Sequence, residues 1–182
     1  MTTLVEKMIP ARALTDLAVY LQTCAHIENA AWAIVRLSKR EVDSLDHGRF
    51  IESVKLKAVT RRLVEEFQYA ASRCPPAIAV QIVLLHSRIE AGLINRNLAA
   101  HGAFFVDDFA KGVLVEHYFS TGSGAQKTWH HVPQRISRRE IEEAIDEADM
   151  LLREAVNVRR QLSSWIKLNA SSFEEYLWAD GF

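Results

Sequence analysis

Apolar residues recur at three- and four-residue spacing in four long segments of the chain. This spacing predicts four helices, each with one buried stripe, over about residues 11–40, 50–73, 77–101 and 138–167. Pro75 and Pro76 separate the second helix from the third, because proline donates no helical hydrogen bond and disfavours helix before it. The pattern therefore predicts a mainly helical protein.

The third predicted helix is apolar on nearly every side between Ala77 and Leu85. Such a helix belongs in the middle of a bundle or across a subunit interface. It is expected to end near His101, where Gly102 could take the left-handed conformation that closes a helix.

The pattern changes between residues 103 and 132, where short aromatic and β-branched runs alternate with turn residues. We expect two or three strands here, inserted between the third and fourth helices. Ser137 to Glu140 fits a capping box that starts the fourth helix, and a short aromatic helix could follow over about 171–179. The expected fold is a four-helix bundle with a small β insertion, forming one domain over residues 1–182.

Composition restricts the class of protein. Of 182 residues, 49% are hydrophobic and 25% charged, and the net charge of −1 excludes a globally basic nucleic-acid binder, although not a local basic groove. Cys24 and Cys74 are expected to be small buried hydrophobes. With no apolar signal segment before Pro10 and no stretch judged apolar enough to cross a membrane, we expect a cytoplasmic protein.

The most informative motif lies at the end of the third helix, where Arg96, Asn97 and His101 form Arg-Asn-x-x-x-His. Here the sequence resembles the HEPN superfamily of four-helix proteins, over roughly residues 11–168. The resemblance implies a metal-independent endoribonuclease without cofactors, often the toxin of a toxin–antitoxin or antiviral system. Other members of that superfamily only bind or regulate, so a non-catalytic regulatory or partner-binding protein is the alternative.

The chemical properties of Arg96, Asn97 and His101 suit RNA cleavage independently of the resemblance to the HEPN superfamily. Histidine can take or give a proton near neutral pH, arginine presents a fork of donors to a phosphate, and asparagine can orient a substrate. Arg96 and His101 are five residues apart, about 140° around a helix, so one helix does not aim both at one atom. Two such helices related by a two-fold axis could, which favours a homodimer.

Plainer interpretations remain open. Arg96 could cap helical carbonyls or pair with Glu90, and His101 could favour a helix end because of the dipole. A metal site formed by His117, His130 and His131 with Glu116 is less favoured than a strand of paired aromatic rings, because the neighbours His130 and His131 should face opposite sides. Arg135, Arg138 and Arg139 could hold an RNA backbone, and the plainer interpretation is a solvated helix start. His86 is expected to be a core or interface histidine with a hydrogen bond. A third possible function is a nucleotide-binding sensor that uses the same polar cluster.

Overall fold

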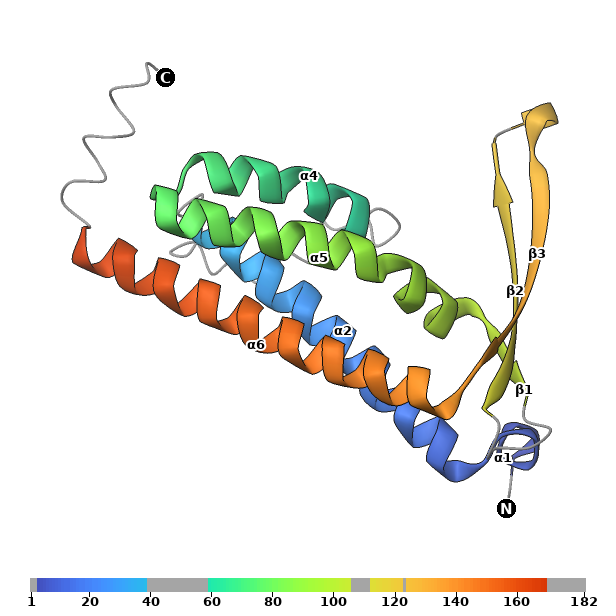
Figure 1. Cartoon of the computed structure of the whole chain (residues 1–182). Helices are drawn as coiled ribbons and strands as arrows, with labels where there is room; N and C mark the ends of the chain where they lie inside the picture. The colour runs from blue at the N-terminus through green and yellow to red at the C-terminus, as the bar shows by residue number, and fades with distance from the viewer. Residues whose placement is uncertain (1–2, 39–58, 106–111, 123, 170–182) are drawn as a thin grey trace. The chain divides into compact units, whose positions relative to one another are not determined.

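The computed structural model describes residues 3–38, 59–105, 112–122 and 124–169, and these are mainly helical with a small antiparallel sheet (Figure 1). The described α-helices are α1 (Leu4–Met8), α2 (Ala11–Ser38), α4 (Val59–Ser72), α5 (Pro76–His101) and α6 (Arg138–Leu168). The strands are β1 (Ala103–Phe105), β2 (Val113–Thr121) and β3 (Thr128–Ile136), with a 3-10 turn, η3 (Gly124–Gln126), between the last two.

Helices α2, α4, α5 and α6 lie where four helices were expected, and the strands lie between α5 and α6 as expected. The first part of the second expected helix, 50–58, and the expected helix at 171–179 lie outside the described residues. Helix α1 was not expected, because five residues are too few to show periodicity. Its signal was a capping box, in which the Thr3 hydroxyl accepts from the Glu6 amide and the Glu6 carboxylate accepts from the Thr3 amide.

The chain divides into two compact units, and each is described by itself. The first unit comprises Met1–Ala25 and Ala91–Met150, and the second comprises His26–Glu90 and Leu151–Phe182. The division falls inside α2, α5 and α6, so each unit takes part of all three helices. The expectation of one domain stays a prediction.

The second unit has an apolar core supplied by all four of its helical segments. Fully buried residues include Ile34 on α2, Phe67 on α4, Ile82 on α5 and Leu162 on α6. The ring of His86 on α5 lies 6.4 Å from that of Phe67. Its Nε2 is buried without a hydrogen-bond partner among the described residues, so the expected hydrogen bond is not formed by this nitrogen.

Polar contacts join α5 to α6 in the same unit. The Gln81 amide donates to Gln161 Oε1 at 3.0 Å, and Arg88 pairs with Glu154. On the same stretch of α5, however, Val80, Val83 and Leu84 are 60%, 52% and 61% exposed. Helix α5 therefore contributes to the core and also presents an uncovered apolar face.

Helix α5 also corrects an expectation about membranes. By length and composition alone it is long and apolar enough to cross one, with a mean hydropathy of 1.5 in a window of which 22% is buried. The core helix of a globular bundle meets the same criterion, so this finding assigns no location. The expectation that no such stretch exists was wrong.

The sheet belongs to the first unit and has the strand order β1-β2-β3, with both pairs antiparallel. Phe104 lies opposite Val115, and Val115 lies opposite Gln134. Strand β3 runs on to Ile136, four residues beyond the expected end at 132, because Val113 and Leu114 pair with Ile136 and Arg135. Since successive side chains alternate between faces, residues 113, 115, 117 and 119 of β2 share one face.

The base of the sheet packs on the helices of the first unit. Ala13 of α2, Leu98 of α5, Val113 and Val115 of β2 form a buried cluster. The partly buried residues Ile9, Phe104, Ile136 and Ile141 pack against it. The sheet face that carries Val113 and Val115 is therefore the face that meets the helices, and it positions the residues farther along that face.

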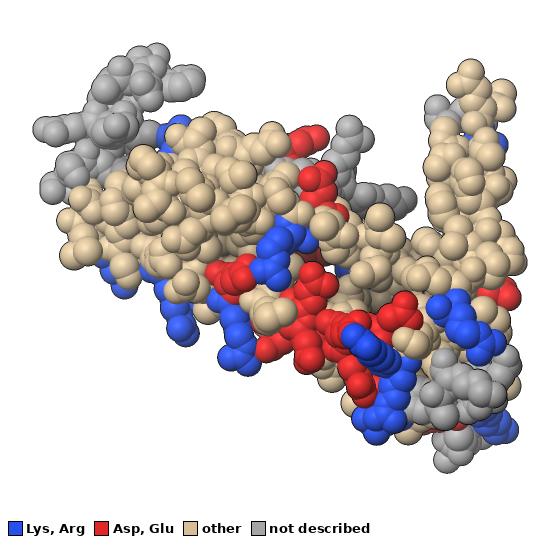
Figure 2. Space-filling model, viewed as in Figure 1, with Lys and Arg blue, Asp and Glu red and all other residues tan. Residues whose placement is uncertain are grey.

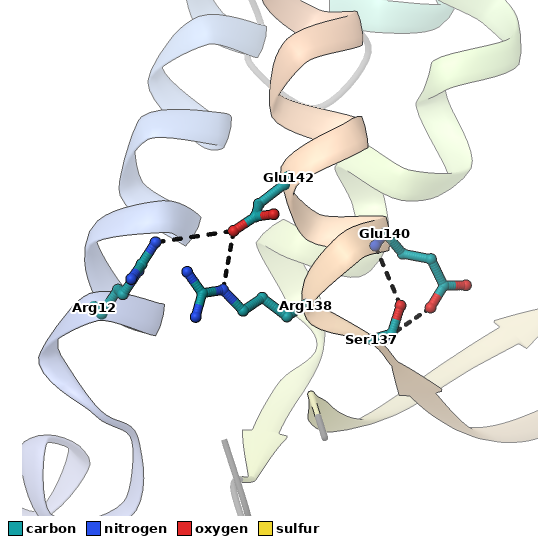
Figure 3. Close-up of polar contacts among 5 residues, drawn as sticks. All are labelled: Arg12, Ser137, Arg138, Glu140 and Glu142. Carbon is teal, nitrogen blue, oxygen red and sulfur yellow. Dashed lines mark hydrogen bonds and ion pairs between the residues drawn. The ribbon is translucent and has the colours of Figure 1, made fainter. Parts of the chain in front are cut away.

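Helix α6 starts with the expected capping box (Figure 3). The Glu140 amide donates to Ser137 Oγ at 3.2 Å, and the Ser137 amide donates to Glu140 Oε2 at 2.7 Å. Hydrogen bonds from the Ser137 side chain and backbone hold the pKa of the Glu140 carboxyl below its ordinary value. Glu142 accepts from Arg138 at 2.9 Å and lies 3.8 Å from Arg12 of α2. These exposed pairs favour the interpretation of Arg138 as part of a solvated helix start.

We expect Ser137→Ala to lower the free energy of unfolding by about 1 kcal/mol, because an amide at the start of α6 loses its acceptor. Urea denaturation at pH 7 measures this loss. Because the Glu140 pKa is lowered on folding, its contribution is present above the unfolded pKa and lost as pH falls through the folded one. The difference between variant and wild type should therefore narrow in acid. An equal or larger difference in acid would contradict this account of the cap.

Candidate functional site

On the last turns of α5, Asn97 and His101 are four residues apart and share a side of the helix, whereas Arg96 lies about 140° around the helix from His101. Arg96 is half-buried, whereas Asn97 and His101 are exposed. Arg96 Nη1 donates to Asn97 Oδ1 at 3.2 Å. The neighbours Asn95, Leu98 and Ala99 instead face a pocket inside the first unit. Arg96 and Asn97 are thus brought together, while His101 lies farther along the helix.

Arg96 lies within electrostatic range of Tyr20 on α2. Burial is the main cause that raises the Tyr20 pKa, and Cys24 and Glu147 raise it further. Arg96 acts in the opposite direction, because its positive charge favours the phenolate. The guanidinium therefore lies where α2 and α5 come together in the first unit, a place that the linear motif does not reveal.

His101 instead contacts the sheet. Its ring stacks with that of His117 on β2, with 6.4 Å between the ring centroids and 21° between the planes. The row continues along the same strand face to Phe119, 5.4 Å from His117, and then to His130 on β3, 4.9 Å from Phe119. His130 Nε2 and Thr121 Oγ1 are hydrogen-bonded at 2.8 Å. We call His101, His117, Phe119 and His130 the imidazole row; it follows one face of the hairpin formed by β2 and β3.

The opposite face of the hairpin carries a different set of rings. His131 stacks on Tyr118 at 4.2 Å, and its Nε2 lies 3.7 Å from Glu116 Oε2. His130 and His131 therefore face opposite sides, and the expectation of paired aromatic rings is confirmed. Within residues 3–38, 59–105, 112–122 and 124–169, the structure has no group of three His, Cys, Asp or Glu side chains arranged to hold a metal ion.

The sequence had signalled His117 only as a metal ligand, and its place beside His101 was missed. The signal lay in the two-residue period of β2, since Val113, Val115 and His117 share a face whose first two members are buried. Val115 packs against the end of α5, and His117 is the next residue along the same face of β2, so His117 lies close to His101. What was lacking was the register between the strand and the helix end.

Gly102 sets that register, and its conformation differs from the expected one. Among the described glycines, positive φ values occur at Gly112 and Gly122, not at Gly102. The Gly102 amide still donates to the Leu98 carbonyl at 2.8 Å, and the chain passes directly into β1. A Cβ on Gly102 would lie 2.5 Å from Val115 Cγ1 and 2.6 Å from the Leu98 oxygen. Glycine is required here by close approach rather than by a left-handed backbone.

Charge is distributed unevenly in the first unit. Acidic side chains gather over the first half of α6, whereas the drawn face of the hairpin is largely uncharged (Figure 2). The imidazole row contains no carboxylate, and Glu116 lies on the other face. A polyanion would therefore meet less repulsion along the row than over α6.

No family model, curated protein or solved structure matches this chain. The assignment of a function therefore rests on the side chains themselves. The geometry offers two adjacent imidazoles, an arginine hydrogen-bonded to an asparagine one turn earlier, and a row of rings leading away from them.

We expect Gly102→Ala to lower the free energy of unfolding by about 1–3 kcal/mol, because the new methyl group must displace Val115 or the backbone. Gly92→Ala is the matched control, since a Cβ there meets nothing within 4 Å. In the middle of α5 that change should stabilise by about 0.5–1 kcal/mol. Thermal or urea denaturation of both variants measures the difference. Equal effects of the same sign would refute the close approach at Gly102.

Proposed function

We propose that this protein is a metal-independent endoribonuclease of the HEPN type, built on a four-helix bundle with a β insertion. The observation that carries the proposal is the pair of stacked imidazoles of His101 and His117, one helical turn along α5 from the hydrogen-bonded Arg96 and Asn97. Metal-free RNA cleavage requires a general base, a general acid and positive charge near the phosphate. These four side chains supply all three requirements.

In the proposed reaction the 2′-hydroxyl oxygen attacks the adjacent phosphorus, and the bond from phosphorus to the 5′-oxygen breaks. One imidazole takes the 2′-hydroxyl proton, and the other, protonated, gives a proton to the leaving 5′-oxygen. Arg96 stabilises the charge that develops on the phosphoryl oxygens, and Asn97 positions the substrate. The products are a 2′,3′-cyclic phosphate and a free 5′-hydroxyl.

A homodimer is part of this proposal. Arg96 and His101 are about 140° apart around α5, so a second copy would bring an arginine to the face of a histidine. The exposed Val80, Val83 and Leu84 on α5 support a subunit contact, because contiguous exposed apolar residues commonly mark interaction surfaces. The proposal places the protein in the cytoplasm, with RNA as its substrate and an antitoxin as a partner.

We expect the wild-type protein to cleave a mixed RNA in EDTA and to leave cyclic phosphate ends. His101→Ala, His117→Ala and Arg96→Ala should each reduce the cleavage rate by about 100-fold or more, because each removes a proton-transfer group or the phosphate donor. Gel electrophoresis of end-labelled RNA measures the rate, and the cyclic ends are identified by their resistance to direct ligation.

His131→Ala is the matched control for these variants, because it removes an imidazole from the other face of the same hairpin. It should cleave at the wild-type rate. Circular dichroism establishes that every variant is folded. No cleavage by the folded wild type would overturn the nuclease, and equal loss in His131→Ala would overturn the role given to His117.

We expect the wild type to be a dimer in sedimentation equilibrium and Leu84→Glu to weaken it by about 100-fold, on the order of 3 kcal/mol, because a charge would be buried without a partner. Val19→Glu controls for the added charge, since Val19 is a 47% exposed apolar residue on a different helix, α2. A monomeric wild type would overturn the dimer. Binding of the wild type to lipid vesicles that Leu84→Glu abolishes would also contradict it.

The second candidate function is a non-catalytic, partner-binding protein on the same fold. The acidic surface over the first half of α6 favours it, because such a surface repels RNA and attracts a basic protein (Figure 2). The cleavage experiment separates the two candidates, since only the nuclease requires turnover by the wild type.

A further inference from the structure

The first unit contains a pocket of about 300 Å³ that the proposed nuclease does not use. It opens among α2, the end of α5, the base of the sheet and the start of α6. Its size is at the lower end of the range for small-molecule sites. On α5 its lining residues are Asn95, Leu98 and Ala99. The exposed His101 is not among the residues that line it.

The inner wall of the pocket is apolar. Its large lining side chains come from different elements of the unit: Leu17, Leu98, Phe104, Ile136, Ile141 and Ile145. Four of them, Leu98, Phe104, Ile136 and Ile141, belong to the cluster that holds the sheet on the helices, so the wall is preformed. A ligand that fills this space needs an apolar body.

Among the described residues, the charged side chains that line the pocket are all acidic: Asp16 on α2 and Glu140, Glu143 and Glu147 on α6. Glu140 is engaged in the capping box, and Glu143 pairs with Arg139 at 2.6 Å. Two carboxylates therefore remain for a ligand, Asp16 and Glu147.

Of these two carboxylates, Asp16 is better suited to bind a charged group of a ligand. It is half-buried, and it forms no hydrogen bond or ion pair with any described residue. One turn along α2, Tyr20 also lines the pocket, and Glu147 lies near enough to raise the pKa of its hydroxyl. Asp16, Tyr20 and Glu147 thus offer two negative charges and an aromatic ring to one end of an apolar space, a combination that suits an ammonium group.

We propose that this pocket binds a small organic cation, a primary amine carried on an aromatic or aliphatic body. The body fills the apolar wall, and the ammonium group pairs with Asp16 and lies within the field of Glu147. A neutral analogue would leave Asp16 uncompensated, and an anionic one would meet repulsion from four carboxylates. None of the described residues that line the pocket takes part in the proposed RNA cleavage, although Arg96 lies within electrostatic range of Tyr20.

Isothermal titration of the full-length protein with three indoles of similar shape tests the proposal. Tryptamine carries an ammonium group, tryptophol a hydroxyl group and indole-3-acetate a carboxylate. We expect tryptamine to bind at least about tenfold more tightly than tryptophol, and indole-3-acetate to bind most weakly, because only the charge differs substantially. No saturable binding of tryptamine at millimolar concentration, or equal binding of all three compounds, overturns the proposal.

Two variants locate the binding. Asp16→Asn should bring the affinity for tryptamine down to that for tryptophol and leave tryptophol binding unchanged. Glu142→Gln is the matched control, since Glu142 is an exposed carboxylate in the first half of α6 that does not line the pocket. It should bind all three indoles as the wild type does. Equal loss of tryptamine affinity in both variants would mean that net charge rather than this pocket attracts the amine, and would overturn the assignment.

Discussion

The close approach at Gly102 is the constraint on which the arrangement of the first unit depends. Helix α5 ends there and strand β1 begins with no intervening loop, so the sheet starts directly beside the last helical turn. Val115 occupies the space that a side chain at 102 would need. This contact fixes which residue of β2 lies beside the end of α5. It thereby sets the imidazole of His117 beside that of His101 and encloses the apolar wall of the pocket.

Much of the fold could be predicted from local patterns, because helix periodicity, the proline pair and the Ser137 capping box act within a few residues. Three features could not. The five-residue helix α1 is too short to show a period, the extension of β3 depends on its pairing with β2, and the exposed apolar face of α5 depends on which helices surround it. The last two are decided by partners distant in sequence, whereas α1 is set by the local capping box of Thr3 and Glu6.

The candidate site divides in the same way. Arg96, Asn97 and His101 were found from one short motif, and the divergence of Arg96 from His101 around the helix followed from helical geometry. Predicting the contact of His101 with His117 requires the position of β2 relative to the end of α5, which the sequence alone does not give. The pocket could be predicted even less, since its carboxylates come from α2 and α6 and its large apolar side chains from five elements, α2, α5, β1, β3 and α6. Linear motifs reveal chemistry carried on one helix, whereas enclosed spaces arise only from packing.

The alternation of side chains along the hairpin has an evolutionary consequence. The two faces of β2 and β3 hold separate sets of rings, so substitutions can accumulate on the Tyr118 face without altering the His117 face. Insertions near Gly122 would lengthen the tip and leave both sets in place. A single-residue deletion between Val115 and His117, by contrast, would exchange the two faces beyond that point. Related chains should therefore vary freely in hairpin length, and should vary between these two positions only in steps of two residues.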